Sequence, residues 1–99
     1  MYIFEFTKQT FDSPRRSHSW ERELADGTTI DSVAAFCTQL DTDTDESDDM
    51  IDGVDKSGAV QVYTVQAGLS GKDYKITLQM ERSDGQTSEV DILMHVRDT

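Results

Sequence analysis

The chain has 99 residues, with 20 acidic and 9 basic side chains and a formal net charge of −11. That charge repels phosphate, so neither nucleic acid nor an anionic membrane surface is expected as a partner. The sequence shows no apolar run of 18 residues and no signal-peptide pattern, so we expect no spanning helix and synthesis in the cytoplasm. A chain of this length predicts one domain, residues 1–99, with a thin core.

The first 19 residues are expected to form an N-terminal segment that precedes the core strands of the domain. The aromatic and β-branched residues of Tyr2–Phe6 can form a short strand that a free terminus would hold loosely. Lys8–Ser19 contains the single proline and a group of basic or histidine side chains: Lys8, Arg15, Arg16 and His18. We therefore interpret residues 1–19 as an extended arm or loop. Its Arg15-Arg16-Ser17-His18 patch is expected to be solvated, with docking of an acidic partner as the alternative.

Trp20–Leu24 has the composition of a short strand, and Asp26-Gly27 has that of a turn. Trp20 is the only tryptophan, and we expect it to anchor the core. The alternative is an exposed binding residue, since aromatic side chains are enriched at interfaces. Cys37 is the only cysteine, which excludes an internal disulfide and predicts a small buried apolar residue.

The stretch Ile30–Leu40 fits two periodicities. Helical spacing joins Ile30, Val33, Ala34, Cys37 and Leu40, whereas one face of a strand joins Ile30, Ala34, Phe36 and Leu40. The periodicity alone leaves helix and strand open.

A dense acidic segment follows. Eight acids and no base fall within residues 41–55: Asp41, Asp43, Asp45, Glu46, Asp48, Asp49, Asp52 and Asp55. Most of the net charge is therefore local, and residues 41–57 predict a solvated acidic loop. Met50, Ile51 and Val54 could contribute a short edge piece.

The spacing Asp41-x-Asp43-x-Asp45 resembles the start of an EF-hand calcium loop. The pattern then departs from that loop, because Glu46 stands where glycine is needed and Asp52 where a bidentate glutamate is needed. A solvated loop is the prediction, and an irregular calcium site is the alternative.

Val60–Ala67 is rich in β-forming residues and predicts a strand. Its apolar face changes between Val62 and Tyr63, which predicts a bulge or a switch of sheet. Gly68–Gly71 follows as a turn.

An antiparallel hairpin joins Asp73–Glu81 to Thr87–Arg97, where apolar and polar residues alternate with period two. A two-residue turn at Asp84-Gly85 would place core residues opposite charged ones. A three-residue turn, Ser83-Asp84-Gly85, opposes apolar residues in the pairs Leu78–Val90, Ile76–Ile92 and Tyr74–Met94. It also puts glycine where a left-handed backbone is needed. Short strands of this kind, separated by glycine turns, predict an all-β fold of two packed sheets.

The residues favour no catalytic chemistry. His18 and His95 could form a metal site with one cysteine only if acids contributed, and His95 is expected on the polar face of the last strand. No nucleophile elbow, HExxH helix or phosphate loop is present. We predict that the chain is not an enzyme, and we assign no catalytic, cofactor-binding or metal-ligating residue.

Three features together resemble a known group of proteins. They are Trp20 and Leu24 before Gly27-Thr28-Thr29-Ile30, the run from Tyr63 to Tyr74 with its glycine turn, and the final hairpin with Gly85 and Arg97. The chain resembles short proteins encoded among the structural genes of tailed bacteriophages and prophages. It departs from their pattern with Thr28 in place of the usual aspartate and with no aromatic residue at Ala35.

The resemblance implies an immunoglobulin-like sandwich of two antiparallel sheets. In such a fold, Gly71-x-x-Tyr74 opens the next-to-last strand and its tyrosine packs at the corner between the sheets. The resemblance also favours a strand for Ile30–Leu40.

The leading functional hypothesis is a non-enzymatic structural or accessory protein of a phage virion, at the head, neck or tail. It would lie in the virion, or in the host cytoplasm during assembly, and bind other phage structural proteins through a sheet edge or loops. It could also form a homo-oligomer in the particle. The alternative is an immunoglobulin-like recognition or adhesion module whose acidic segment holds calcium.

Overall fold

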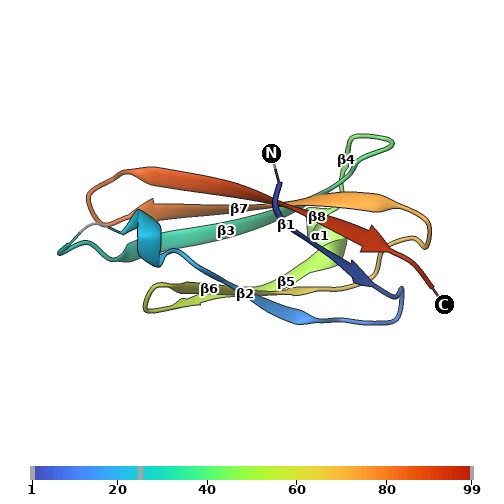
Figure 1. The fold of residues 1–99 in the computed structure, drawn as a ribbon, viewed down its shortest axis with the longest axis horizontal. Helices are drawn as coiled ribbons and strands as arrows, with labels where there is room; N and C mark the ends of the chain where they lie inside the picture. Colours follow the sequence, from blue (N-terminus) through green and yellow to red (C-terminus); the bar gives the residue numbers. More distant parts are fainter. Residues whose placement is uncertain (1, 25, 99) are drawn as a thin grey trace.

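Two β-sheets pack face to face in the computed structural model, which describes residues 2–24 and 26–98 (Figure 1). The large sheet has the strand order β1-β8-β7-β3-β4, and the small sheet has the order β2-β6-β5. The strands of the large sheet are β1 Tyr2–Lys8, β3 Ile30–Gln39, β4 Thr44–Asp45, β7 Asp73–Arg82 and β8 Thr87–Val96. Those of the small sheet are β2 Arg15–Ser19, β5 Ile51–Ser57 and β6 Val60–Val65. The predicted all-β, two-sheet sandwich is confirmed.

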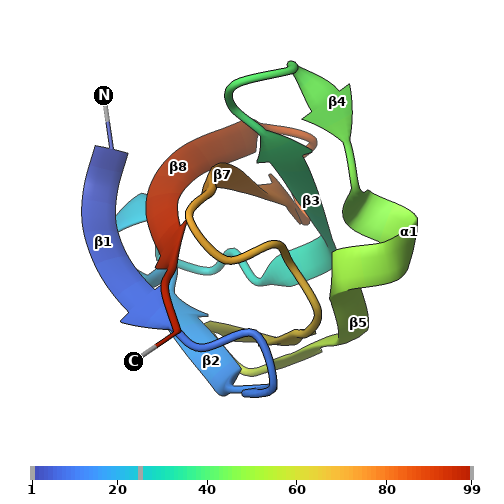
Figure 2. The same cartoon turned by 90° about the vertical axis from the view of Figure 1, so that its right-hand side faces the viewer.

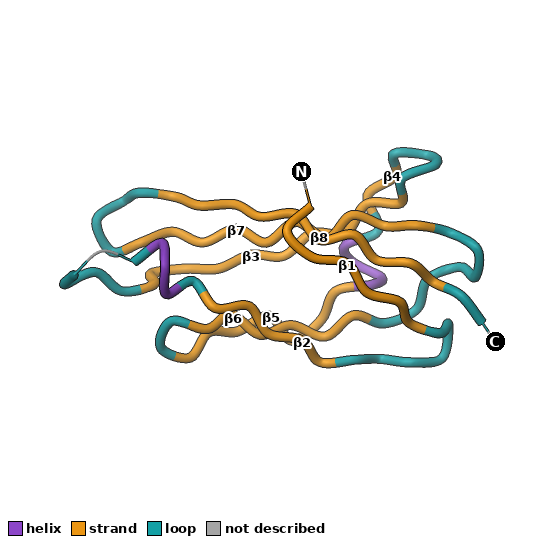
Figure 3. The backbone as a smooth tube through the Cα atoms, in the orientation of Figure 1, coloured by secondary structure: helices purple, strands orange, loops and turns teal. Residues whose placement is uncertain are grey.

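In the described part of the chain, helix is confined to two short pieces, the 3₁₀ turn Glu21–Glu23 and α1 Ser47–Met50 (Figure 3). No helix among the described residues is long and apolar enough to cross a membrane.

Apolar side chains from both sheets fill the space between them. The buried apolar residues are Trp20, Ile30, Cys37, Met50, Tyr63, Val65, Tyr74, Ile76, Leu78, Met80, Ile92, Met94 and Val96. Trp20 has no exposed surface, which confirms it as a core anchor. It follows β2 directly, and the chain then turns into the 3₁₀ helix, so the strand predicted for Trp20–Leu24 is wrong.

The C-terminal hairpin has the predicted register. Tyr74 pairs with Met94, Ile76 with Ile92, and Leu78 with Val90. The N–H of Arg82 donates to the carbonyl of Gln86 (2.8 Å), which closes a loop of three residues. Gly85 occupies its third position with φ 88°, a left-handed backbone that favours glycine. The three-residue turn is therefore confirmed.

Tyr74 is buried where β7 begins. Its hydroxyl accepts a hydrogen bond from the backbone N–H of Leu69 (2.9 Å). Gly71, with φ 88°, lies between them, and its N–H donates to the carbonyl of Val96 (2.8 Å). The tyrosine therefore pins the loop before β7 against the end of the sandwich.

Ile30–Gln39 is a strand, as the resemblance implied, but its apolar face differs from the expected one. The register shifts between Ile30 and Ser32, so the side chains after this irregularity change face. Cys37 and Gln39 are buried, whereas Phe36 and Leu40 are exposed. The face predicted through Ala34, Phe36 and Leu40 is therefore wrong.

β6 alternates without a break and keeps one continuous register with β2, so the change of face predicted between Val62 and Tyr63 is wrong. A register irregularity does occur at this point in the pairing with β5, where Asp52 pairs with Thr64 and Asp55 with Val62. Its inward face is Gln61, Tyr63 and Val65, all buried. Gln61 looked like an outward residue because it is polar. Its side chain instead accepts a hydrogen bond from Trp20 Nε1 (2.9 Å) and donates to the carbonyl of Ala34 in β3 (2.9 Å).

Residues 1–19 and 41–57 form more strand than expected. β1 pairs with β8 in parallel, which departs from a wholly antiparallel sandwich, and β2 joins the small sheet. The acidic segment contains β4, α1 and β5 in place of the expected loop. Its acids point mostly to solvent, while Met50 is 2% exposed and Ile51 packs against the core. Burial of these two apolar side chains holds the segment against the sandwich.

We predict that Gln61→Leu destabilises the fold, because it leaves the Trp20 side-chain N–H buried without a partner and removes the Gln61 hydrogen bond to the partly buried Ala34 carbonyl. The expected loss is about 2–4 kcal/mol, or roughly 10–25 °C in melting temperature. Gln79→Leu, on the exposed face of β7, is the control and should shift stability by less than about 0.5 kcal/mol.

A double-mutant cycle separates the hydrogen bond from packing. Trp20→Phe should cost less on top of Gln61→Leu than it does alone. Equal costs in the two backgrounds would show that Trp20 and Gln61 are not coupled.

Candidate docking surface

Four strands border the two sheets, and they differ in what they expose. β4 has two residues, and β5 carries acids and a register shift between Asp52 and Asp55. Short, charged or irregular strands are the usual protection of a sheet edge. β1 has seven residues and an unpaired edge opposite β8. Of β1, β4 and β5, it is therefore the edge most suited to accept another strand.

β1 and the loop after it are rich in exposed apolar surface. Ile3 is 51% exposed, Phe4 is 52% exposed, and Tyr2 is also exposed. Phe11, in the loop to β2, is 97% exposed. Apolar side chains that gather on one exposed segment are typical of interaction sites.

The end of β1 is firmly anchored. Lys8 is 3% exposed, and its Nζ donates to the carbonyls of Gln9 (2.8 Å) and Asp12 (3.0 Å). Thr10 donates from its N–H and hydroxyl to the Asp98 carboxylate, both at 2.9 Å. These bonds fix β1 in place while its outer edge stays free, so the edge is preorganised for binding.

β2 borders the small sheet on the same side of the sandwich as β1 (Figure 2). Arg16 projects from β2 toward β1, and its guanidinium carbon lies 3.7 Å from the centre of the Phe6 ring and 5.3 Å from that of Phe4. These cation–π contacts, worth ~1 kcal/mol, join the two sheets along this side.

The predicted basic patch is therefore divided between two faces. Arg15 turns outward and donates to the carbonyl of Gly53 (3.1 Å) and the hydroxyl of Thr64 (2.9 Å). Arg16 and His18 turn inward, as strand alternation requires. The His18 ring meets Trp20 edge to face, at 4.6 Å between ring centres, and burial lowers the pKa of His18.

His95 lies on the polar face of β8, as the sequence predicted, and connects three strands. Its Nε2 is 3.0 Å from a Glu5 oxygen in β1, and its Nδ1 is 2.8 Å from Asp73 at the start of β7. Arg97 also pairs with Asp73 at 2.8 Å. The carboxylates of Glu5 and then Asp73 accept hydrogen bonds from the His95 ring and raise the pKa of His95, and the His95 contact lowers the pKa of Asp73.

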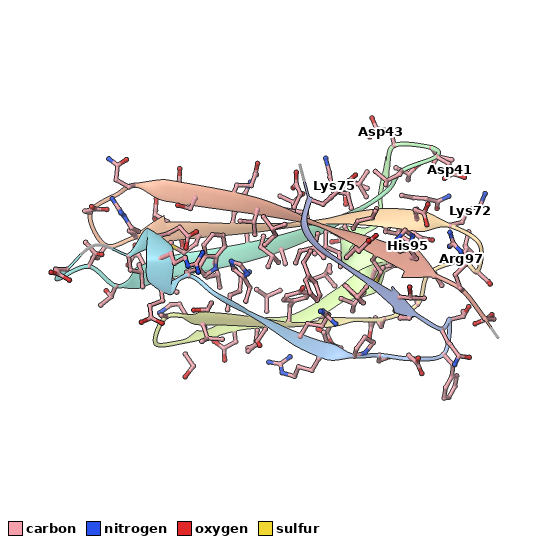
Figure 4. The ribbon with its side chains drawn as sticks, in the orientation of Figure 1. Asp41, Asp43, Lys72, Lys75, His95 and Arg97 are labelled. Carbon is pink, nitrogen blue, oxygen red and sulfur yellow. The ribbon has the colours of Figure 1, made fainter. Side chains whose placement is uncertain are left out.

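Two acids of the calcium-loop-like pattern, Asp41 and Asp45, have protein partners. Asp41 pairs with Lys72 (2.7 Å), which lowers the pKa of Asp41. Figure 4 places this pair at the same end of the molecule as His95 and Arg97. Asp45 accepts hydrogen bonds from the N–H and hydroxyl of Ser47. Within the described ranges, no three His, Cys, Asp or Glu residues gather so as to hold a metal ion.

Cys37 is fully buried, as expected from the sequence. Burial, with smaller contributions from Glu46 and Asp45, raises the pKa of its thiol to about 12. The thiol therefore stays protonated at neutral pH and is a poor nucleophile.

The fold and this surface define a small β-sandwich protein whose prominent feature is an exposed apolar strand edge. One family model, described as podophage GP4 fiber-tail adaptor protein gp77, matches residues 8–95 of the chain. The chain belongs to this family of phage structural proteins, which confirms the resemblance found in the sequence. No curated protein sequence matches it significantly.

We predict that the attachment of β1 weakens as the pH rises. Because the folded-state pKa of His95 is raised, its contribution is complete below the unfolded value of about 6.5 and is lost as the pH climbs through the folded value. The stability difference between the unmodified protein and His95→Gln should therefore be larger at pH 5.5 than at pH 8.5. The pairs are partly exposed, so a few tenths of a kcal/mol is expected.

Thermal melts of the two proteins across this range measure the effect, and hydrogen exchange of the β1 amides locates it. A stability difference that is independent of pH would contradict the assignment.

Proposed function

We propose that this chain is a structural component of a podophage virion that links a fiber to the tail. The proposal includes that it acts through protein contacts and carries out no catalysis. The observation that carries it is the family match over residues 8–95. The exposed, apolar and anchored β1 edge supports it independently, because a linker between two proteins needs a preformed binding surface more than an enclosed pocket.

We further propose that the fiber contributes a strand that adds to β1. A sheet edge offers a row of unpaired backbone N–H and C=O groups to such a strand, and adjacent side chains provide selectivity. The exposed Tyr2, Ile3 and Phe4 would supply apolar contact beside that backbone pairing. The acidic face of β4, α1 and β5 lies at another edge of the sandwich and stays free for solvent or for the tail.

The buried Tyr74, bonded to Leu69, supports an immunoglobulin-like variety of the sandwich. The parallel pairing of β1 with β8 would then be a feature of this chain's N-terminal strand.

The first prediction of this proposal concerns location. Mass spectrometry of purified virions should detect the chain, and a particle stripped of its fibers should retain it if it is anchored on the tail side. Intact virions that lack the chain would contradict the proposed function.

The second prediction concerns the β1 edge. Ile3→Lys places a charge on the edge, and such lysines block strand addition. The affinity for purified fiber protein should fall at least about tenfold, which corresponds to 1.4 kcal/mol. The matched control is Val54→Lys on β5, where the replaced side chain is 36% exposed. Unchanged fiber affinity in Ile3→Lys, or equal losses in both variants, would show that β1 is not the docking edge.

A further inference from the structure

A cleft of about 260 Å³ opens between β1 and β2, beside the proposed docking edge. Its lining comprises Ile3, Phe4, Arg16, Ser17, His18, Ser19, Tyr63 and Ile92. The lining carries a single formal charge, the positive one of Arg16, in a chain whose net charge is −11. The cleft is therefore a positive site in an otherwise acidic molecule.

Two buried polar atoms of the cleft lining lack a fully formed hydrogen bond. In the part of the chain that the structure describes, His18 Nε2 has no hydrogen-bond partner, and the Tyr63 hydroxyl has none with full hydrogen-bond geometry, although the Arg16 guanidinium approaches it. Tyr63 has no exposed surface, and an unsatisfied buried polar group costs about 1–3 kcal/mol. Such a cost at a surface cleft is expected where a binding partner supplies the missing group.

Arg16 completes this set of polar groups. It pairs with Tyr63 across β2 and β6. Its charge, with a smaller contribution from hydrogen bonding to the Tyr63 hydroxyl, offsets part of the rise that burial gives the pKa of Tyr63. No carboxylate of the described residues lies within ion-pair distance of Arg16. Its contacts with Phe4 and Phe6 use the flat face of the guanidinium. Such stacking leaves N–H groups at its rim available for hydrogen bonding, and their planar arrangement matches a carboxylate.

The position of the cleft tells which group of a partner could enter it. Alternate side chains of a strand added to β1 would point inward, on the face that carries Phe4 and Phe6. Cross-strand neighbours on one face lie about 5 Å apart. An inward side chain opposite Phe4 would therefore meet the rim of the Arg16 guanidinium.

We propose that the cleft binds the side-chain carboxylate of an aspartate or glutamate in the partner strand. This inference rests on the proposed docking at β1 and adds the chemistry of the residue recognised. Arg16 supplies the charge, and the Tyr63 hydroxyl and the His18 ring supply the remaining polar contacts. The cleft would set the register of the partner strand, because only one acidic residue can occupy it.

The test is a nuclear magnetic resonance titration with N-acetyl-glutamate N-methylamide, with the corresponding glutamine compound as the neutral control. The glutamate compound should shift the signals of Arg16, His18 and Tyr63 in a saturable way, and the glutamine compound should bind at least about tenfold more weakly. Arg16→Gln should abolish the difference between the compounds, and Arg15→Gln, on the outward face of the same strand, should retain it. Equal responses to the two compounds, or a difference that survives Arg16→Gln, would overturn the proposal.

Tyr63→Phe tests the same contact with little risk to folding, because it removes only a buried hydroxyl that lacks a fully formed hydrogen bond. It should leave the melting temperature unchanged or raise it, and it should weaken binding of the glutamate compound. A lower melting temperature together with unchanged binding would mean that the hydroxyl holds an ordered water only, and it would also overturn the proposal. Fiber binding that depends on Ile3 but not on Arg16 would reject the carboxylate site and leave the proposed function standing.

Discussion

The hydrogen-bonded chain from Trp20 through Gln61 to Ala34 is the constraint on which the sandwich depends. Trp20 follows β2, Gln61 lies in β6, and Ala34 lies in β3. The two hydrogen bonds therefore connect the small sheet to the large one. Apolar contacts hold the two sheets together but do not define their relative alignment. A buried polar group keeps its hydrogen bonds in one alignment only, so it does define it. That alignment also decides where β2 lies relative to β1, and hence the shape of the proposed docking side.

The sequence predicted the hairpin well because its information is local. A period of two and a glycine that needs a positive φ at position 85 together determine the register. The same reasoning failed where a long-range contact decided the outcome. Gln61 is polar yet buried because Trp20, far away in the sequence, supplies its partner. The irregularity after Ile30 changed the face of β3 through pairing with β7, which a periodicity count cannot detect.

The docking surface was only partly predictable. The sequence predicted binding through a sheet edge or loops and noted the basic residues near Arg15. Those residues were expected to form one patch, although Arg15 and Arg16 point to opposite faces of a strand. The apolar residues of Tyr2–Phe6 were expected in a loosely held strand, whereas the structure anchors β1 along β8 and through Lys8. Parallel pairing between chain ends joins residues far apart in sequence, and no local pattern shows it.

The central claim is that a strand of the fiber completes the large sheet at β1. Cryo-electron microscopy of the intact tail, at a resolution that separates strands, tests it most directly. The account predicts a sixth strand, belonging to the fiber, beside Tyr2–Lys8, with one of its acidic side chains next to Arg16. A tail in which the fiber contacts this chain elsewhere and the β1 edge faces solvent would contradict the account.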